Sequence, residues 1–231
     1  MINKILEQGS KSIGRFEKVL RMSRNVWVPR GILISEGFIF CALCDLYDVD
    51  IILESGVYNA GSTLIWAKYF KKEIKSWDVT IRNDAKDRVR DYPRVELIQG
   101  DGRFGIREYL NRHPFKKVGI FLDGPKGVDA VNWAKRFMGY SNVKFATFHD
   151  CHKLSYGKEN ITRIEAEKYQ GTQFYSDLEP FVKKYAYLDK EIIGKKDEEQ
   201  GIYWQPYKIS DDKGVHRCLG SYGMTIGGYC R

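Results

Sequence analysis

Five acidic residues occupy the same position in five successive segments of the chain, each at the end of a short apolar run. They are Glu54, Asp78, Asp101, Asp123 and Asp150. Carboxylates accept hydrogen bonds, hold divalent cations and take up protons, so a ring of them suits a polar or partly cationic ligand. Randomly placed surface charge would not recur in this way. The pattern therefore predicts one ligand site built from the ends of several strands.

The elements that position these carboxylates follow from the hydrophobic pattern. Short apolar runs alternate with amphipathic segments, which is typical of βαβ units and of a mostly parallel sheet covered on both faces. We expect strands over 49–53, 74–79, 95–98, 118–122 and 143–148, and helices near 62–70, 84–91, 107–112 and 129–137. Ligands of such sheets bind outside the carboxyl ends of the strands. The expected fold is therefore α/β, a doubly wound Rossmann-like sheet.

The two ends of the chain have different patterns. Helical spacing of apolar residues predicts an N-terminal helical cap over 1–48, with its second helix over 35–46, and leaves 49–231 as the ligand-binding domain. After the fifth strand we expect helices over 161–169 and 176–187. Extended, glycine-rich segments over 202–209 and 216–229 indicate a closing antiparallel hairpin.

The turn after the first strand is the candidate binding loop. Gly56 allows a ligand to approach the backbone, Gly61 allows the next helix to begin tightly, and Ser62 can cap that helix. The G-x-G-x-x-G fingerprint and the P-loop are both missing, since Val57 and Tyr58 stand where a glycine would be. These absences disfavour a dinucleotide or ATP site. An ordinary strand–helix turn would also contain incidental glycines.

Several of these residues form an ordered set of motifs. In chain order they are Glu54-x-Gly56, Gly61-Ser62-Thr63, Trp77-Asp78, Gly100-Asp101 and Leu122-Asp123-Gly124-Pro125-Lys126-Gly127. The set resembles class I S-adenosylmethionine-dependent methyltransferases. It is most similar to small O-methyltransferases of the macrocin O-methyltransferase and cephalosporin-hydroxylase-like kind, which modify natural products and sugars. The resemblance covers about residues 49–151, and it departs from the family in having fewer glycines in the first turn.

The resemblance implies S-adenosylmethionine as the cofactor. Glu54 and Gly56 would border its methionine part, Asp78 would hold the ribose, and Asp101 with Arg103 or Phe104 would meet the adenine edge. The implied cofactor-binding residues are Glu54, Gly56, Tyr58, Gly61, Ser62, Asp78, Asp101, Gly102, Arg103 and Asp123. Carboxylates and helix-terminal N–H groups suit a ligand that carries a sulfonium, an ammonium and a carboxylate.

Asp123 and Asp150 end neighbouring strands and could hold Mg²⁺ or Mn²⁺. Such a cation would lower the pKa of an acceptor hydroxyl. Without a metal, His149 or His152 could act as the general base, although both could simply be packed or surface histidines. Lys126 would either neutralise an acidic substrate or remain solvated.

Composition limits the partners. The chain has 231 residues and a formal charge of +8, from 38 basic and 30 acidic residues, which permits an anionic partner. The lysine doublets are scattered, so a nucleic-acid partner is not expected. Cys41 and Cys44 lie in an apolar helical segment and are expected to be core residues, and an odd total of 5 cysteines indicates a reducing, cytoplasmic compartment. No apolar run is long enough to span a membrane.

The expected function is methyl transfer from S-adenosylmethionine to a hydroxyl of a sugar, glycan or glycosylated small molecule, assisted by a divalent metal. Aromatic residues are dense after the fifth strand, and sugars stack on such side chains. Two alternatives remain open, a nucleic-acid methyltransferase and a non-catalytic cofactor-binding protein. The sequence is also compatible with a homo-oligomer.

Overall fold

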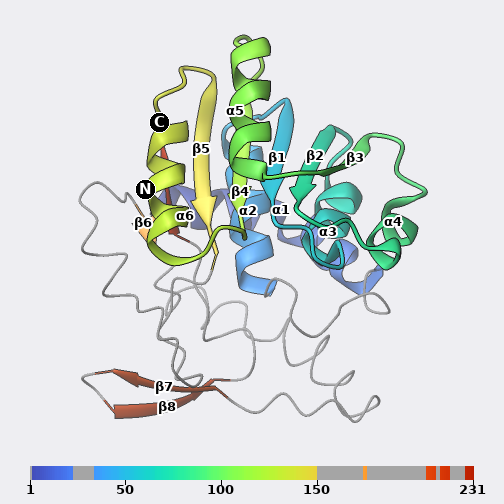
Figure 1. Ribbon diagram of the computed structural model, residues 1–231. Coiled ribbons are helices and arrows are strands. Elements are labelled where there is room, and N and C mark those ends of the chain that lie inside the picture. The colour runs from blue at the N-terminus through green and yellow to red at the C-terminus, as the bar shows by residue number, and fades with distance from the viewer. Residues whose placement is uncertain (1, 23–33, 150–173, 176–206, 212–213, 219–226) are drawn as a thin grey trace.

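The computed structural model describes residues 2–22, 34–149, 174–175, 207–211, 214–218 and 227–231 (Figure 1). Its helices are α1 (Ile2–Met22), α2 (Ile34–Leu46), α3 (Gly61–Tyr69), α4 (Asn83–Val89), α5 (Gly102–Arg112) and α6 (Gly127–Phe137). Its strands are β1 (Ile51–Ser55), β2 (Glu73–Asp78), β3 (Val95–Gln99), β4 (Val118–Leu122), β5 (Val143–Phe148), β6 (Phe174–Tyr175), β7 (Tyr207–Asp211), β8 (Gly214–Cys218) and β9 (Gly227–Cys230). None of the described helices is long and apolar enough to cross a membrane.

The described strands form a seven-stranded sheet in the order β3-β2-β1-β4-β5-β9-β6. Strands β1 to β5 are parallel, whereas β9 runs antiparallel to both β5 and β6. The order reverses between β1 and β4, because β2 and β3 lie on one side of β1 and β5 lies on the other. This arrangement confirms the expected doubly wound α/β fold, and it makes the carboxyl ends of β1 and β4 the switch point where ligands bind.

Helices cover both faces of the sheet (Figure 1). One face buries Ile120 and Leu122 of β4 against α5 and α6. The opposite face buries Phe121 with Phe40 of α2 and Trp66 of α3. Alternate residues of β4 are therefore buried on opposite faces, which explains its continuous apolar run.

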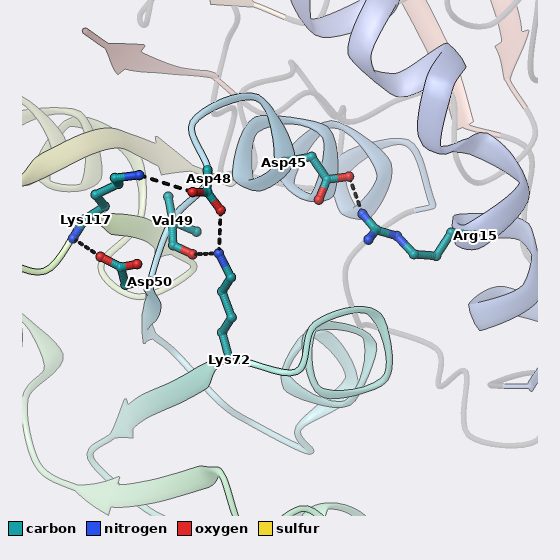
Figure 2. Close-up of polar contacts among 7 residues, drawn as sticks. All are labelled: Arg15, Asp45, Asp48, Val49, Asp50, Lys72 and Lys117. Carbon is teal, nitrogen blue, oxygen red and sulfur yellow. Dashed lines mark hydrogen bonds and ion pairs between the residues drawn. The ribbon is translucent and has the colours of Figure 1, made fainter.

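The N-terminal helices share a core with the sheet. Phe16 of α1 meets Phe38 of α2 edge to face at 5.1 Å between ring centroids. The Arg15 guanidinium forms an ion pair with Asp45 of α2, which Figure 2 shows, and lies 4.0 Å above the ring centroid of Tyr69 in α3. These contacts fasten α1 to α2 and α3.

Ion pairs gather around the amino end of β1 (Figure 2). Asp48 receives Lys72 Nζ at 2.8 Å and Lys117 Nζ at 3.1 Å, and the backbone N–H of Lys117 donates to Asp50 at 2.8 Å. They join the segments that lead into β1, β2 and β4, at the end opposite to the switch point. Because Asp48 is largely exposed, each pair contributes little to stability.

The C-terminal region is described only in part. The helices expected over 161–169 and 176–187 lie outside the described residues. An antiparallel pair is present, in which β7 pairs with β8, as the hairpin prediction requires. Within the extended segment expected over 216–229 the structure describes two strands, β8 and β9, and β9 enters the main sheet beside β5.

Candidate functional site

A cavity of about 530 Å³ lies at the carboxyl ends of the central strands. Four strand ends contribute its walls: Ser55, Gly56 and Tyr58 at β1; Trp77, Asp78 and Val79 at β2; Gly100, Asp101, Gly102 and Arg103 after β3; and Asp123, Gly124, Pro125 and Lys126 after β4. Its volume falls within the range of small-molecule sites. Three of the five predicted carboxylates thus meet in one place.

Two glycines let the backbone segments around the cavity approach closely. Gly56 has φ of 96°, and a Cβ atom there would lie 2.7 Å from the backbone nitrogen of Gly124. A Cβ on Gly102 would lie 2.6 Å from that of Ser55. Real Cβ atoms do not tolerate such distances, so glycine at these two positions permits the close approach of β1 to the segments after β3 and β4.

Asp78 both lines the cavity and shapes the loop after β1. Its Oδ2 accepts hydrogen bonds from the backbone N–H groups of Val57 at 2.8 Å and Tyr58 at 2.9 Å, and its Oδ1 accepts one from Thr80 at 3.1 Å. A carboxylate offers about four lone-pair positions. Three are used by backbone donors, which leaves room for a ligand hydroxyl.

Asp101 caps α5 and holds Arg103 at the edge of the cavity. Its Oδ1 accepts from the backbone N–H of Arg103 at 2.9 Å and from the Arg103 Nε at 2.9 Å. The hydrogen bonds from the Arg103 guanidinium lower the pKa of Asp101 below its usual range. Both residues line the cavity, as predicted, whereas Phe104 is not among the lining residues.

The structure places Glu54, a predicted cofactor-binding residue, in a buried polar network. It is fully buried and does not line the cavity. Its carboxylate accepts hydrogen bonds from Ser62, from Thr63 and Ser76 at 2.6 Å each, and from the Trp66 indole at 3.1 Å. Burial raises its pKa, and these hydrogen bonds oppose the shift. Because β1 continues to Ser55, the Glu54 side chain points from a sheet face onto α3.

The prediction that Ser62 caps α3 was wrong, whereas cofactor binding by Gly61 and Ser62 stays a prediction. The N-cap of α3 is Ala60, which has φ of 59° and makes no side-chain cap hydrogen bond. Ser62 is buried and donates to Glu54, while the Gly61 N–H donates to Asn59 Oδ1 at 3.1 Å. Neither residue lines the cavity. The start of α3 lies one residue earlier than expected, and this turns Ser62 away from the ligand side.

Asp123 lies between two basic side chains. Lys126 forms an ion pair with Oδ1, and Nδ1 of the buried His149 lies 3.2 Å from the same oxygen. The backbone N–H of His149 donates to Leu122 at 2.9 Å, which fixes the start of the segment after β5. Asp123 and Lys126 line the cavity, whereas His149 is not among its lining residues.

Of the two predicted metal ligands, only Asp123 lies among the described residues. Strands β4 and β5 are adjacent, as expected, but Asp150 and His152 lie outside the described residues. Within the described part of the chain, no group of three His, Cys, Asp or Glu side chains could hold an ion. Cys41 and Cys44 are buried core residues, as predicted, and burial raises the pKa of both thiols.

Ser55 and Val79 also line the cavity, although neither was among the predicted cofactor-binding residues. The Ser55 hydroxyl donates to the backbone carbonyl of Gly124, which ties β1 to the loop after β4. Val79 is 70% exposed at the cavity wall. Ser55 and Val79 could have been predicted from their positions directly beside Gly56 and Asp78. The residue at the carboxyl end of a parallel strand and the residue after it face the switch point.

Comparisons with known proteins find similarity only in structure. No protein-family model matches the sequence, and no curated protein matches it. An O-methyltransferase from Bacillus cereus, solved with S-adenosylhomocysteine (SAH), is 12% identical, with a TM-score of 0.48 over 94% of this chain and 91% of that one. The SAH-bound Podospora anserina methyltransferase PaMTH1 is 14% identical, with a TM-score of 0.46 over 94% and 88%.

A third solved structure is the O-methyltransferase TomG from Streptomyces achromogenes, in complex with S-adenosylmethionine. It is 13% identical, with a TM-score of 0.45 over 94% of this chain and 90% of that one. These structural neighbours are methyltransferases that bind S-adenosylmethionine or its product.

Proposed function

We propose that this protein is an S-adenosylmethionine-dependent O-methyltransferase. The observation that carries the proposal is the convergence of Gly56, Asp78, Asp101 and Asp123 from four strand ends on one cavity at the switch point of the sheet. These are members of the ordered motif set that resembles the methyltransferase family. We assign the site to residues 49–231 and treat residues 1–48 as its helical cap.

The residues around the cavity fit the cofactor chemically. Asp78 has a remaining acceptor position for a ribose hydroxyl, and Arg103, fixed by Asp101, presents N–H donors to the acceptor nitrogens of a purine. Gly56 leaves the backbone of the first loop open to the methionine part. When bound, S-adenosylmethionine supplies an electrophilic methyl group on its sulfonium.

The acceptor hydroxyl must lose its proton, and the groups that could remove it lie around Asp123. We propose that Asp123 and Asp150 hold Mg²⁺ or Mn²⁺, whose charge would favour loss of that proton. In the alternative without metal, the paired Asp123 and His149 take up the proton, since their polar atoms lie 3.2 Å apart and a carboxylate beside an imidazole orients it as a base. Lys126 lies at the same wall, where its charge favours an anionic acceptor or the ionised hydroxyl.

We further propose that the acceptor is a sugar, glycan or glycosylated small molecule and that the enzyme works in the cytoplasm. Support for the acceptor class comes from the aromatic residues that follow β5 in the sequence, since flat rings stack on sugar faces. Support for the compartment comes from Cys41, Cys44 and Cys230, which are buried free thiols.

Two measurements test the proposal. Calorimetry with SAH should show saturable binding to the purified chain. Formation of SAH from S-adenosylmethionine should then depend on an added acceptor from a panel of monosaccharides and glycosides. Absence of SAH binding would overturn the proposal. Binding without turnover on any hydroxyl acceptor, with Mn²⁺ and Mg²⁺ each supplied, would favour the non-catalytic alternative.

A further inference from the structure

Four side chains of α5 and α6 form a surface that the proposed reaction does not use. We call Phe104, Arg107, Trp133 and Arg136 the Arg–aromatic patch. The rings of Phe104 and Trp133 meet edge to face at 6.3 Å between centroids. The guanidinium of Arg107 lies 5.3 Å from the Phe104 ring centroid, and that of Arg136 lies 5.0 Å from the Trp133 ring centroid. The helices that carry them cover the same face of the sheet (Figure 1).

The patch is open to solvent and close to the cavity. The Phe104 side chain is 51% exposed, and the Trp133 side chain beside it is partly buried against the core. Arg103, which lines the cavity, also lies 5.9 Å from the Phe104 ring centroid. The patch therefore begins at the edge of the cavity and extends over α5 and α6.

The patch carries positive charge that its neighbours do not cancel. Asp101 is paired with Arg103, and Glu108 is paired with Arg112 at 2.5 Å. Asp129 acts electrostatically on Arg103. Across the described residues, neither Arg107 nor Arg136 forms an ion pair, so both guanidinium groups face solvent with their donors available.

Arginines interleaved with exposed rings match the chemistry of single-stranded nucleic acid. Guanidinium groups bind phosphates, and aromatic faces and guanidinium planes stack on unpaired bases. An acidic peptide would use the arginines and leave the rings without a role. The formal charge of +8 supports a polyanionic partner. We propose that the Arg–aromatic patch binds single-stranded nucleic acid, independently of whether the cavity catalyses methyl transfer.

Fluorescence anisotropy with a fluorescein-labelled oligothymidylate tests this proposal on the full chain. Wild-type protein should bind saturably, with an affinity that falls as salt is added. The double variant Arg107→Gln/Arg136→Gln should bind more weakly, and its slope of log affinity against log salt should be shallower by about 1.4, because each neutralised phosphate of a single strand contributes about 0.7. Phe104→Ala should lose about tenfold in affinity with an unchanged salt slope, because it removes stacking and no charge.

The matched control is Lys86→Gln/Arg90→Gln, which removes two exposed positive charges at α4 and lowers the net charge equally. It should retain the wild-type salt slope. An equal loss in both double variants would overturn the proposal, because binding would then follow net charge alone. Equal competition by polyglutamate would also overturn it, in favour of an acidic protein partner. Far-ultraviolet circular dichroism and thermal unfolding of every variant separate lost binding from lost folding, and SAH calorimetry shows whether the cavity is affected.

Discussion

Oδ2 of Asp78, at the end of β2, accepts a hydrogen bond of 2.8 Å from the backbone N–H of Val57, in the loop after β1. The same carboxylate lines the cavity. One side chain therefore couples the shape of the first loop to the wall that a ligand would touch. A change at Asp78 should alter ligand affinity both directly and through this loop.

We predict that Asp78→Ala weakens SAH binding by about 1.5–3 kcal/mol for each charge-assisted hydrogen bond that the ligand no longer makes. It should also lower the midpoint of thermal unfolding, because Val57 and Tyr58 lose their acceptor. Calorimetry and thermal unfolding measure the two effects. Asp91→Ala, at an exposed aspartate outside the cavity, is the control and should change neither. Unchanged SAH affinity in folded Asp78→Ala protein would remove Asp78 from the site.

Glu54 should be a stability residue. We expect Glu54→Ala to lower the free energy of unfolding by about 3 kcal/mol or more, because three hydroxyls and the Trp66 indole N–H lose a buried acceptor. Glu54→Gln keeps one acceptor oxygen and should cost less. Denaturant unfolding at neutral pH compares the two variants, and equal stability of wild type and Glu54→Ala would contradict the buried network.

The pH dependence of this network has a defined sign. Burial raises the pKa of Glu54 in the folded chain above its usual value of 4.5. The unfolded chain therefore loses this proton first as pH rises, and stability is lost between pH 4.5 and the raised pKa. Relative to Glu54→Gln, the wild type should lose unfolding free energy over this window. A difference that stays constant from about pH 4 to 8 would show that Glu54 does not titrate in this way.

The contribution of Asp101 to stability should depend on pH in the opposite direction to that of Glu54. Hydrogen bonds from Arg103 lower its pKa below 3.8, so its contribution to stability is complete above that value and is lost as pH falls through the lowered pKa. Asp101→Asn is a sharp test, because asparagine still caps α5 but carries no charge. We expect the stability advantage of wild type over Asp101→Asn to shrink below about pH 4. If the unfolding free energies of wild type and Asp101→Asn differ by a constant amount down to about pH 2.5, the lowered pKa of Asp101 is contradicted.

Gly56 should tolerate no side chain. At φ of 96°, with a Cβ position 2.7 Å from the Gly124 nitrogen, Gly56→Ala should destabilise the fold by about 1–3 kcal/mol and reduce SAH affinity. Gly14→Ala is the matched control, because nothing lies within 4 Å of its Cβ position inside α1. That control should be neutral or stabilising, since alanine favours helices. Thermal unfolding and calorimetry of both variants provide the comparison.

Chelation tests the metal. EDTA should abolish methyl transfer while leaving SAH binding intact, and Mn²⁺ or Mg²⁺ should restore turnover. Asp150→Ala should reproduce the effect of chelation, with turnover reduced by orders of magnitude. Full activity in chelated enzyme would end the metal proposal and make His149 or His152 the candidate base.

Much of the fold was predictable because its signal is local. The apolar runs over 118–122 and 143–148 are β4 and β5, and they stand out because a parallel strand is buried on both faces. Asp78, Asp101 and Asp123 were predicted to line a ligand site because every parallel strand ends at the same edge. Glu54 lies in a buried network because β1 ends at Ser55 rather than at residue 53, and successive strand residues face opposite sides of the sheet.

The sequence by itself determined the alternation of strands and helices, the edge of the sheet where ligands bind and most of the carboxylates there. Only the tertiary structure decided that Glu54 belongs to a buried network, and that Phe104 and Arg107 of α5 lie beside Trp133 and Arg136 of α6. In the sequence the basic residues are scattered, because residues 107 and 136 are separated by a whole strand. Arg107 and Arg136 come together because α5 and α6 pack on the same face of the sheet. Their spacing along the chain does not predict this contact.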